Sequence, residues 1–439
     1  MSERGVPARI AAATVLAAVE RGGWSDRLLQ SREEDLDDPR DRRLVHRLVL
    51  SALRWQGAID AVLAPRVSRP LERLPALLRA CLRIGAAQLL VLDQPPHVAV
   101  ATAVGAARAL AGAGAGGLVN AVLRRLGRDR PALDETRTVP GWLLERWEIA
   151  RGPEEARRAL AALNRPARAF LVARPAAGGR ETLARRLREE GVETTASPWH
   201  PEGLSVTRGA PQLTSAFRRG EFVLLDPAAA LVARLAAPSR PGPLADVCAA
   251  PGGKAILLAD RSPDRRLVAL ERHLRRAAEL ADRLRTAVPR AAVVRADATA
   301  PCLPAGRFAA VLVDAPCSGT GTLRRRPERR HRVTPRDVSR CAEQAFRLLE
   351  ASAALVAPGG AIVYAVCSLE PEEGPEVVER FLARRPGFAP EDPTPWLGPD
   401  AAPAIGTGPW PHLDTWPRLE ELDGFFAVRL RRTGGAPRG

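Results

Sequence analysis

Hydrophobic residues in the first part of the chain, residues 1–134, recur at the spacing of amphipathic helices. One stripe shows the pattern: Leu74, Leu77, Leu78, Cys81 and Leu82. This period matches the turn of an α-helix, so that face is expected to be buried. Glycines at 112, 114 and 117 spell a dinucleotide-binding pattern, but no strand precedes them, and we interpret the run 112–117 as a loop. The pattern predicts an all-helical first domain.

Residues 135–240 show a mixed pattern. Short strand-like pieces at 169–173, 203–207 and 222–225 surround a helical stretch at 181–190. The proline-rich run 238–243 then marks a boundary. We therefore expect a small α+β domain over 135–240.

The third part, residues 241–439, alternates short apolar strands with helical segments. The predicted strands are 244–248, 267–270, 292–294, 309–313 and 361–366, with a last one at 425–430 after a Pro/Gly/Trp-rich segment, 391–423. Such alternation predicts a mostly parallel, doubly wound α/β sheet. Ligands of these sheets bind beyond the carboxyl ends of the strands, so the residues there are the candidates for function.

The first of these strand ends carries a glycine turn, in the run Asp246-Val247-Cys248-Ala249-Ala250-Pro251-Gly252-Gly253-Lys254-Ala255. Two glycines opening a helix let a ligand approach the backbone, yet the run lacks the first glycine and the Ser/Thr of a phosphate-binding loop. Glu271, at the next strand end, suits a ribose diol, and Asp297 ends the third strand. These features fit S-adenosylmethionine; the alternative is a glycine turn with unrelated acids.

Two cysteines and an acid follow the next strands. Asp314 and Cys317 lie after the fourth strand, and Cys367 lies after the fifth. A single cysteine is more often a buried structural residue, but two at neighbouring strand ends beside a carboxylate favour a nucleophile.

The charge of the chain is strongly basic. It has 66 basic and 50 acidic residues, a formal charge of +16, and Lys254 is its one lysine. Nucleic acid is the first candidate partner, whereas a solubilising surface is the alternative. Five arginines after the fourth-strand motif are predicted to contact nucleic-acid phosphates: Arg324, Arg325, Arg326, Arg329 and Arg330.

The six cysteines contain no C-x-x-C pair, so neither a disulfide framework nor a zinc site is expected. The first apolar run ends at Glu20 and Arg21, which argues against a signal peptide, and no run is long enough to span a membrane. We expect a cytoplasmic monomer without a metal.

Three stretches, DVCAAPGGKA, DAPCSGTGTLRRRPE and YAVCSLEPEE, resemble the motifs of the Sun family of RNA cytosine-5 methyltransferases. The run 117–125 resembles the NusB-like RNA-binding domain that is fused to the bacterial ribosomal RNA enzymes of this family. The resemblance implies a multidomain protein: a NusB-like domain, a small middle domain and a Rossmann-like methyltransferase domain. It implies S-adenosylmethionine as cofactor and small-subunit (16S) ribosomal RNA as substrate.

The resemblance also implies roles for individual residues. Cys367 matches the nucleophile, Cys317 the cysteine that assists release, and Asp314 the acid at the base. The cofactor positions would be Asp246, Cys248, Ala249, Ala250, Pro251, Gly252, Gly253, Lys254, Glu271, Asp297 and Asp314. Val366 departs from the family's usual threonine before the nucleophile. Two alternatives remain: a tRNA or DNA cytosine methyltransferase, and an inactive RNA-binding protein.

Overall fold

The computed structural model describes residues 5–33, 36–300, 302–417 and 422–434. The chain divides into two compact units: residues 1–166 together with 323–332, and residues 167–322 together with 333–439. The segment 323–332 therefore belongs to the first unit, although it lies within the sequence of the second.

The first unit is helical. Its helices are α1 (Val6–Glu20), α2 (Ser25–Glu33), α3 (Pro39–Arg54), α4 (Gln56–Leu63), α5 (Ala76–Leu90), α6 (Pro96–Ala111), α7 (Ala113–Asp129), α8 (Gly141–Arg151) and α9 (Pro153–Asn164). Four of the five residues of the predicted apolar stripe lie on α5, where Leu78, Cys81 and Leu82 are buried. Leu74 precedes Pro75 and lies outside the helix. The prediction of an all-helical first domain is confirmed.

The predicted loop at 112–117 is wrong. Gly112, with φ +86°, is the cap between α6 and α7, but the following glycines lie inside α7. A β-carbon at Gly116 would lie 2.4 Å from Cγ of Arg108, so a side chain there would clash with α6. Close helix packing, rather than a turn, thus accounts for a glycine that the sequence suggested was a loop residue.

Two further helices follow residue 134 within the first compact unit. Helices α8 and α9 pack against each other, and Leu143, Trp147 and Leu163 are buried. The turn Glu135–Thr138 contacts α4 as well as α8 and α9, and it links these two helices to the first unit, which continues to Pro166.

The middle segment forms an antiparallel four-stranded sheet of order β2-β3-β1-β4. Its elements are β1 (Phe170–Ala173), α10 (Arg180–Glu189), β2 (Glu193–Ala196), β3 (Gly203–Arg208), α11 (Ser215–Arg218) and β4 (Phe222–Leu225). The predicted α+β class is confirmed. Strand β2 was not predicted, because its largely exposed residues carry no apolar alternation.

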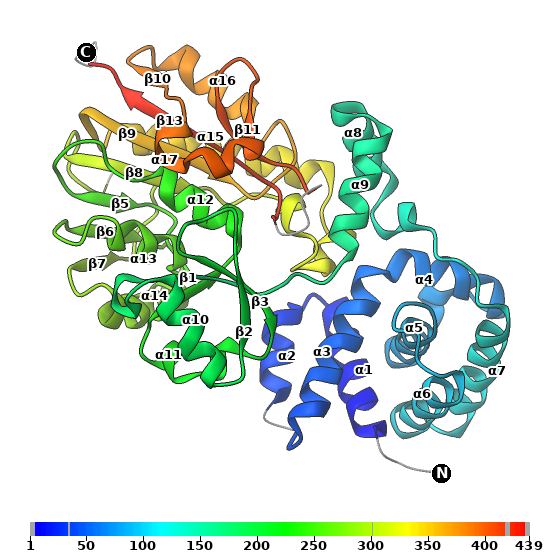
Figure 1. Ribbon diagram of the computed structural model, residues 1–439. Coiled ribbons are helices and arrows are strands. Elements are labelled where there is room, and N and C mark those ends of the chain that lie inside the picture. The colour runs from blue at the N-terminus through cyan, green and yellow to red at the C-terminus, as the bar shows by residue number, and fades with distance from the viewer. Residues whose placement is uncertain (1–4, 34–35, 301, 418–421, 435–439) are drawn as a thin grey trace. The chain divides into compact units, whose positions relative to one another are not determined.

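The C-terminal segment is built on a nine-stranded mixed sheet, in which the order β11-β12-β13-β9-β8-β5-β6-β7 is joined by β10 beside β13 (Figure 1). Its strands are β5 (Leu244–Asp246), β6 (Leu267–Leu270), β7 (Ala291–Val294), β8 (Phe308–Asp314), β9 (Val356–Val366), β10 (Phe388–Pro390), β11 (Ile405–Gly406), β12 (His412–Thr415) and β13 (Phe425–Arg432). Strands β5 to β9 are parallel, whereas β13 runs antiparallel to β9. All six predicted strands are present.

Helices cover both faces of this sheet, as the doubly wound prediction required. They are α12 (Pro227–Leu235), α13 (Gly253–Asp260), α14 (Leu274–Ala287), α15 (Pro335–Ala353), α16 (Pro375–Arg384) and the short α17 (Thr394–Leu397). Successive β5 residues point to opposite faces: Leu244 packs in a core with α12 and α13, and Ala245 in a core with α15 and α16.

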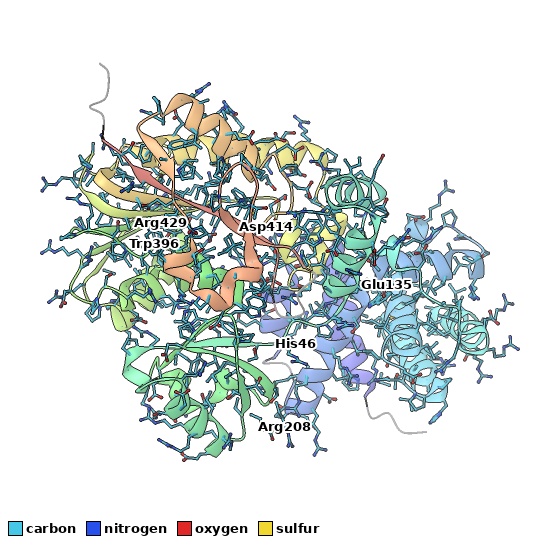
Figure 2. All side chains as sticks on the ribbon, turned by 45° about the horizontal axis from the view of Figure 1, so that its top comes forward. His46, Glu135, Arg208, Trp396, Asp414 and Arg429 are labelled. Carbon is cyan, nitrogen blue, oxygen red and sulfur yellow. The ribbon has the colours of Figure 1, made fainter. Side chains whose placement is uncertain are left out.

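A buried arginine of β13 contacts the beginning of the Pro/Gly/Trp-rich segment 391–423, at Glu391 and Trp396. Arg429 donates to Glu391 at 2.8 Å and to the carbonyl oxygens of Leu235 and Ala237, and its guanidinium lies 4.0 Å from the ring centre of Trp396 (Figure 2). Leu235 and Ala237 lie at the end of α12 and Trp396 lies in α17, so Arg429 joins these two helices to the last strand. Among the described helices, none has the length and apolarity that a membrane crossing needs.

Candidate active site

The strand order reverses between β5 and β8, and this is where the predicted acids meet. Asp246 ends β5, which pairs with β6 on one side and with β8 on the other. Asp314 ends β8 and is opposite Ala365 of β9. The carboxyl ends of β5, β8 and β9 therefore lie side by side, the usual place for a ligand in such a sheet.

A cavity of about 190 Å³ opens at this reversal. Most of its lining was predicted from the sequence: Asp246, Cys248, Ala249, Ala250, Pro251, Gly253, Lys254 and Asp314. Four further lining residues were not predicted: Leu224, Leu225, Ala229 and Arg283. The first three follow from the packing of β4 and α12 against this domain, which no local motif indicates.

The turn between β5 and α13 needs its glycine. Gly252 caps α13 with φ +100°, and a β-carbon there would lie 2.9 Å from Cδ1 of Leu280. Two arginines of α14 hold the turn: Arg276 donates to the carbonyl oxygen of Ala250, and Arg283 to that of Pro251, both at 3.0 Å. Neither arginine was predicted, because their partners are backbone atoms far away in sequence.

Lys254 and Arg283 are the two basic residues in the cavity lining, and Lys254 is the one that pairs with a carboxylate there. Its Nζ lies 2.8 Å from Oδ2 of Asp314 and 5.4 Å from the ring centre of Phe425. Burial would lower the pKa of Lys254, but the negative charges of Asp314, Cys367 and Asp246 outweigh it and raise the pKa. The ammonium therefore stays charged beside the two acids.

The surroundings of Asp246 favour the neutral form of its side chain, whereas those of Lys254 favour the charged form. Its carboxyl group is buried, and burial together with the nearby Asp314 carboxylate raises its pKa to about 7. The same surroundings raise the pKa of the Cys248 thiol well above its usual range. Cys248 is therefore a lining residue with a neutral thiol rather than a nucleophile.

Two predicted cofactor acids lie outside the lining of this cavity. Glu271 is buried and accepts from the backbone N–H of His273 at 2.9 Å, and its second oxygen pairs with Arg276 at 3.3 Å. Asp297 is exposed and accepts from the N–H and hydroxyl of Thr299. These hydrogen bonds lower the pKa of Asp297.

The two predicted thiols lie together. Sγ of Cys317 is 3.3 Å from Sγ of Cys367, and both side chains are partly exposed. The loop after β8 is held next to β9, since Gly321 N–H donates to the carbonyl oxygen of Cys367 at 3.1 Å. A β-carbon at Gly321 would lie 2.0 Å from the carbonyl oxygen of Gly424, so only glycine fits here.

Part of the predicted RNA contact is wrong, because two of the five arginines after this loop, Arg324 and Arg330, are buried. Arg330 is fully buried and donates to the carbonyl oxygens of Arg54 and Leu163 and to Oδ1 of Asn164. Arg324 is 2% exposed. Neither guanidinium reaches solvent, because segment 323–332 packs as part of the helical unit.

Other members of the run remain available to solvent. Arg326 is exposed, with Asp26 at 3.9 Å, and Arg325 and Arg329 are partly exposed. Arg332, which follows the run, donates to the carbonyl oxygens of Val19 and Gly23.

Within the described ranges, no cluster of His, Cys, Asp and Glu has the make-up of a metal site.

Three family models match the chain. The model described as 16S rRNA methyltransferase RsmB/F matches residues 234–431, the NusB family matches 6–128, and the RsmF/B-like ferredoxin-like domain matches 139–212. The first match contains the whole cavity apart from Leu224, Leu225 and Ala229.

Solved structures show the same fold. The crystal structure of PH0851 has a TM-score of 0.82 at 24% identity and covers 98% of this chain and 99% of its own. NSun6 from Pyrococcus horikoshii with SFG has a TM-score of 0.59 at 20% identity, covering 67% of this chain and 99% of its own.

Relatives match over nearly the full length. Ribosomal RNA small subunit methyltransferase B of Xylella fastidiosa is 37% identical over 97% of this chain and 98% of the relative. The Xanthomonas campestris protein of that name is 37% identical, covering 97% of each. The chain belongs to the ribosomal RNA small subunit methyltransferase B family.

Proposed function

We propose that this protein transfers a methyl group from S-adenosylmethionine to C5 of a cytosine in small-subunit ribosomal RNA, through a transient bond between Cys367 and C6. The observation that carries the proposal is the pair of thiols 3.3 Å apart, at strand ends next to the Lys254–Asp314 ion pair. Methylation of an exocyclic or ring nitrogen needs no cysteine, whereas attack from C5 does.

The cavity suits the proposed cofactor. S-adenosylmethionine would supply an electrophilic methyl group on a sulfonium centre. The backbone from Cys248 to Pro251 offers polar groups at close range, and Asp246 and Asp314 offer negative charge to a cation. SFG, held by the NSun6 neighbour, is an analogue of this cofactor. Glu271 stays our proposal for the ribose, and Asp297 and Gly252 stay proposed contacts beyond the cavity lining.

The chain's own residues account for activation of the base. The thiolate of Cys367 adds to C6, and the ring electrons move so that C5 becomes nucleophilic. A proton at N3 stabilises the charge that develops there. We assign to the Asp314 carboxylate, which Lys254 holds in place, the acceptance of the Cys367 thiol proton and its delivery to N3. C5 then takes the methyl group.

Release needs the C5 proton to leave. We assign its removal to Cys317: the C5–H electron pair forms the C5–C6 double bond, and the Cys367–C6 electrons return to sulfur. The 3.3 Å separation between the two sulfur atoms suits these two roles, because C5 and C6 are bonded neighbours in the ring. Val366 is fully buried in the hydrophobic core on one side of the sheet.

The target base must leave its stack to reach a thiol, so we infer that the substrate is a loop or single-stranded stretch of RNA. Exposed and partly exposed arginines near the fourth-strand motif, Arg325, Arg326 and Arg329, are the proposed phosphate contacts. The NusB-like domain is the second proposed RNA contact.

The experiment is methyl transfer from labelled S-adenosylmethionine to ribosomal RNA, tRNA and DNA, assayed separately and taken from cells that lack this protein, followed by digestion to nucleosides. The expected product is 5-methylcytidine in small-subunit RNA. Label in tRNA or DNA alone would favour those substrates, and no label in any nucleic acid would favour an RNA-binding protein without activity. Cys367→Ala should abolish transfer while cofactor binding survives.

A further inference from the structure

A buried carboxylate that the sequence did not single out lies next to both thiol-bearing loops. Glu373, in the turn before α16, is fully buried. Its Oε1 accepts from the backbone N–H of Ser318 at 2.6 Å, and its Oε2 from the Ser318 hydroxyl at 2.5 Å. The Ser368 hydroxyl also donates to Oε2. Because these serines directly follow Cys317 and Cys367, one carboxylate bridges the two loops.

Further hydrogen bonds close the same network. The hydroxyl oxygens of Ser318 and Ser368 lie 3.2 Å apart, and that of Thr320 lies 3.2 Å from Ser368. The N–H of Leu369 donates to the Thr320 hydroxyl at 2.9 Å. All three hydroxyl-bearing residues are buried. The network is therefore shielded from water, which makes each bond costly to lose.

Glu373 is itself fixed by its main chain. The hydroxyl of Tyr364, the one tyrosine of the chain, donates to the Glu373 carbonyl oxygen. The Glu373 N–H donates to the carbonyl oxygen of Glu370 at 3.1 Å. Tyr364 lies in β9, three residues before Cys367. Its hydrogen bond therefore holds Glu373 in a fixed position relative to the strand that precedes this thiol.

Burying a carboxyl group as completely as that of Glu373 costs free energy of folding, which its hydrogen bonds must offset. Burial raises the pKa of Glu373, and the hydrogen bonds from Ser318 and Ser368 oppose that rise. Buried glutamates are rare, and an apolar residue of similar volume commonly costs less. Neither Ser318 nor Ser368 lines the cavity, so we expect their effect on the site to act through the two loops.

We propose that Glu373 is a positioning residue that clamps the Cys317 and Cys367 loops together and so sets the distance between the two thiols. This rests on the proposed function for its role in catalysis, although the clamp itself is a property of the loops. Addition at C6 and proton removal at C5 take place on bonded atoms, so both sulfurs must stay close. A displacement of about 1 Å in such an arrangement costs about 100-fold in rate.

The test compares Glu373→Ala and Glu373→Gln with Glu379→Ala, a matched control at an exposed site on α16. The alanine variant should lose about 100-fold in kcat, with the KM for RNA and the Kd for cofactor changed less than about twofold. The glutamine variant should stay within about tenfold, because its amide oxygen can accept from Ser318 N–H while its NH₂ donates to the hydroxyls. The control should match wild type.

A second readout does not depend on activity. Diamide oxidises two neighbouring thiols to a disulfide and is itself reduced to the hydrazine. The Cys317–Cys367 disulfide, mapped by mass spectrometry, should form about tenfold more slowly in Glu373→Ala than in wild type. If the alanine variant does not fold, the double variant Ser318→Ala/Ser368→Ala, which removes both hydroxyl donors, should show the same slowing.

Unchanged disulfide rates in either variant would overturn the clamp. A glutamine variant as impaired as alanine would also overturn it, because charge rather than position would then be required. If wild type forms the disulfide rapidly and the variants do so slowly, but no 5-methylcytidine appears, then the clamp stands and the proposed function fails.

Discussion

Nζ of Lys254 lies 2.8 Å from Oδ2 of Asp314, which joins the start of α13 to the end of β8. Lys254 is the single lysine of a chain whose other basic residues are all arginines. The compact ammonium fits a largely enclosed site with a side-chain exposure of 16%, where the planar and larger guanidinium would displace the carboxylate or the turn.

Lys254→Arg should therefore weaken cofactor binding, by about tenfold, or about 1.4 kcal/mol. Titration calorimetry with S-adenosylmethionine measures it. Arg275→Lys is the control, since Arg275 is exposed on α14 and pairs with Glu279 one turn along the same helix. A titration curve for Lys254→Arg that overlays the wild-type curve would make the lysine's identity irrelevant to binding.

Cofactor affinity should depend on pH through Asp246. Burial and the Asp314 carboxylate raise its pKa to about 7, so below pH 7 it is mostly neutral and above it mostly ionised. A cationic ligand favours the ionised form, and affinity should rise up to about tenfold from pH 6 to pH 8. Asp246→Asn should remove that part of the dependence. Parallel pH profiles for the two proteins would contradict the assignment.

The arginines of the run 324–330 should fall into two groups, one that stabilises the fold and one that binds RNA. Arg330→Ala leaves three buried acceptors without their donor and should destabilise the protein by about 3 kcal/mol in urea unfolding. Arg326→Ala should leave stability within about 0.5 kcal/mol but weaken RNA binding and reduce its salt dependence by about one phosphate contact. Equal effects of both variants on stability would argue against this division.

The strands and their end residues could be predicted because the chemistry and the fold use the same short motifs. Asp246, Asp314, Cys317 and Cys367 each follow an apolar run that is long enough to identify as a strand. Parallel strands bring their carboxyl ends to one edge, so their proximity followed from the fold class alone.

What the sequence did not reveal depends on contacts between distant segments. Arg276 and Arg283 bind backbone carbonyl groups, which no local pattern marks. Glu373 ends the YAVCSLEPEE stretch, but its bonds to Ser318, 55 residues away, could not be read from that stretch. The burial of Arg330 was missed for the same reason. A run of arginines looks like a solvated surface until its partners, here Arg54 and Leu163, are known.

The most direct test of the central claim uses a small-subunit ribosomal RNA fragment that contains 5-fluorocytidine. Fluorine at C5 cannot leave as a proton does, so after methyl transfer the enzyme should remain bonded to the ring. Incubation with S-adenosylmethionine, proteolysis and mass spectrometry should then identify Cys367 as the modified residue. Modification of Cys317 instead, or methylated RNA with no protein adduct, would contradict the account.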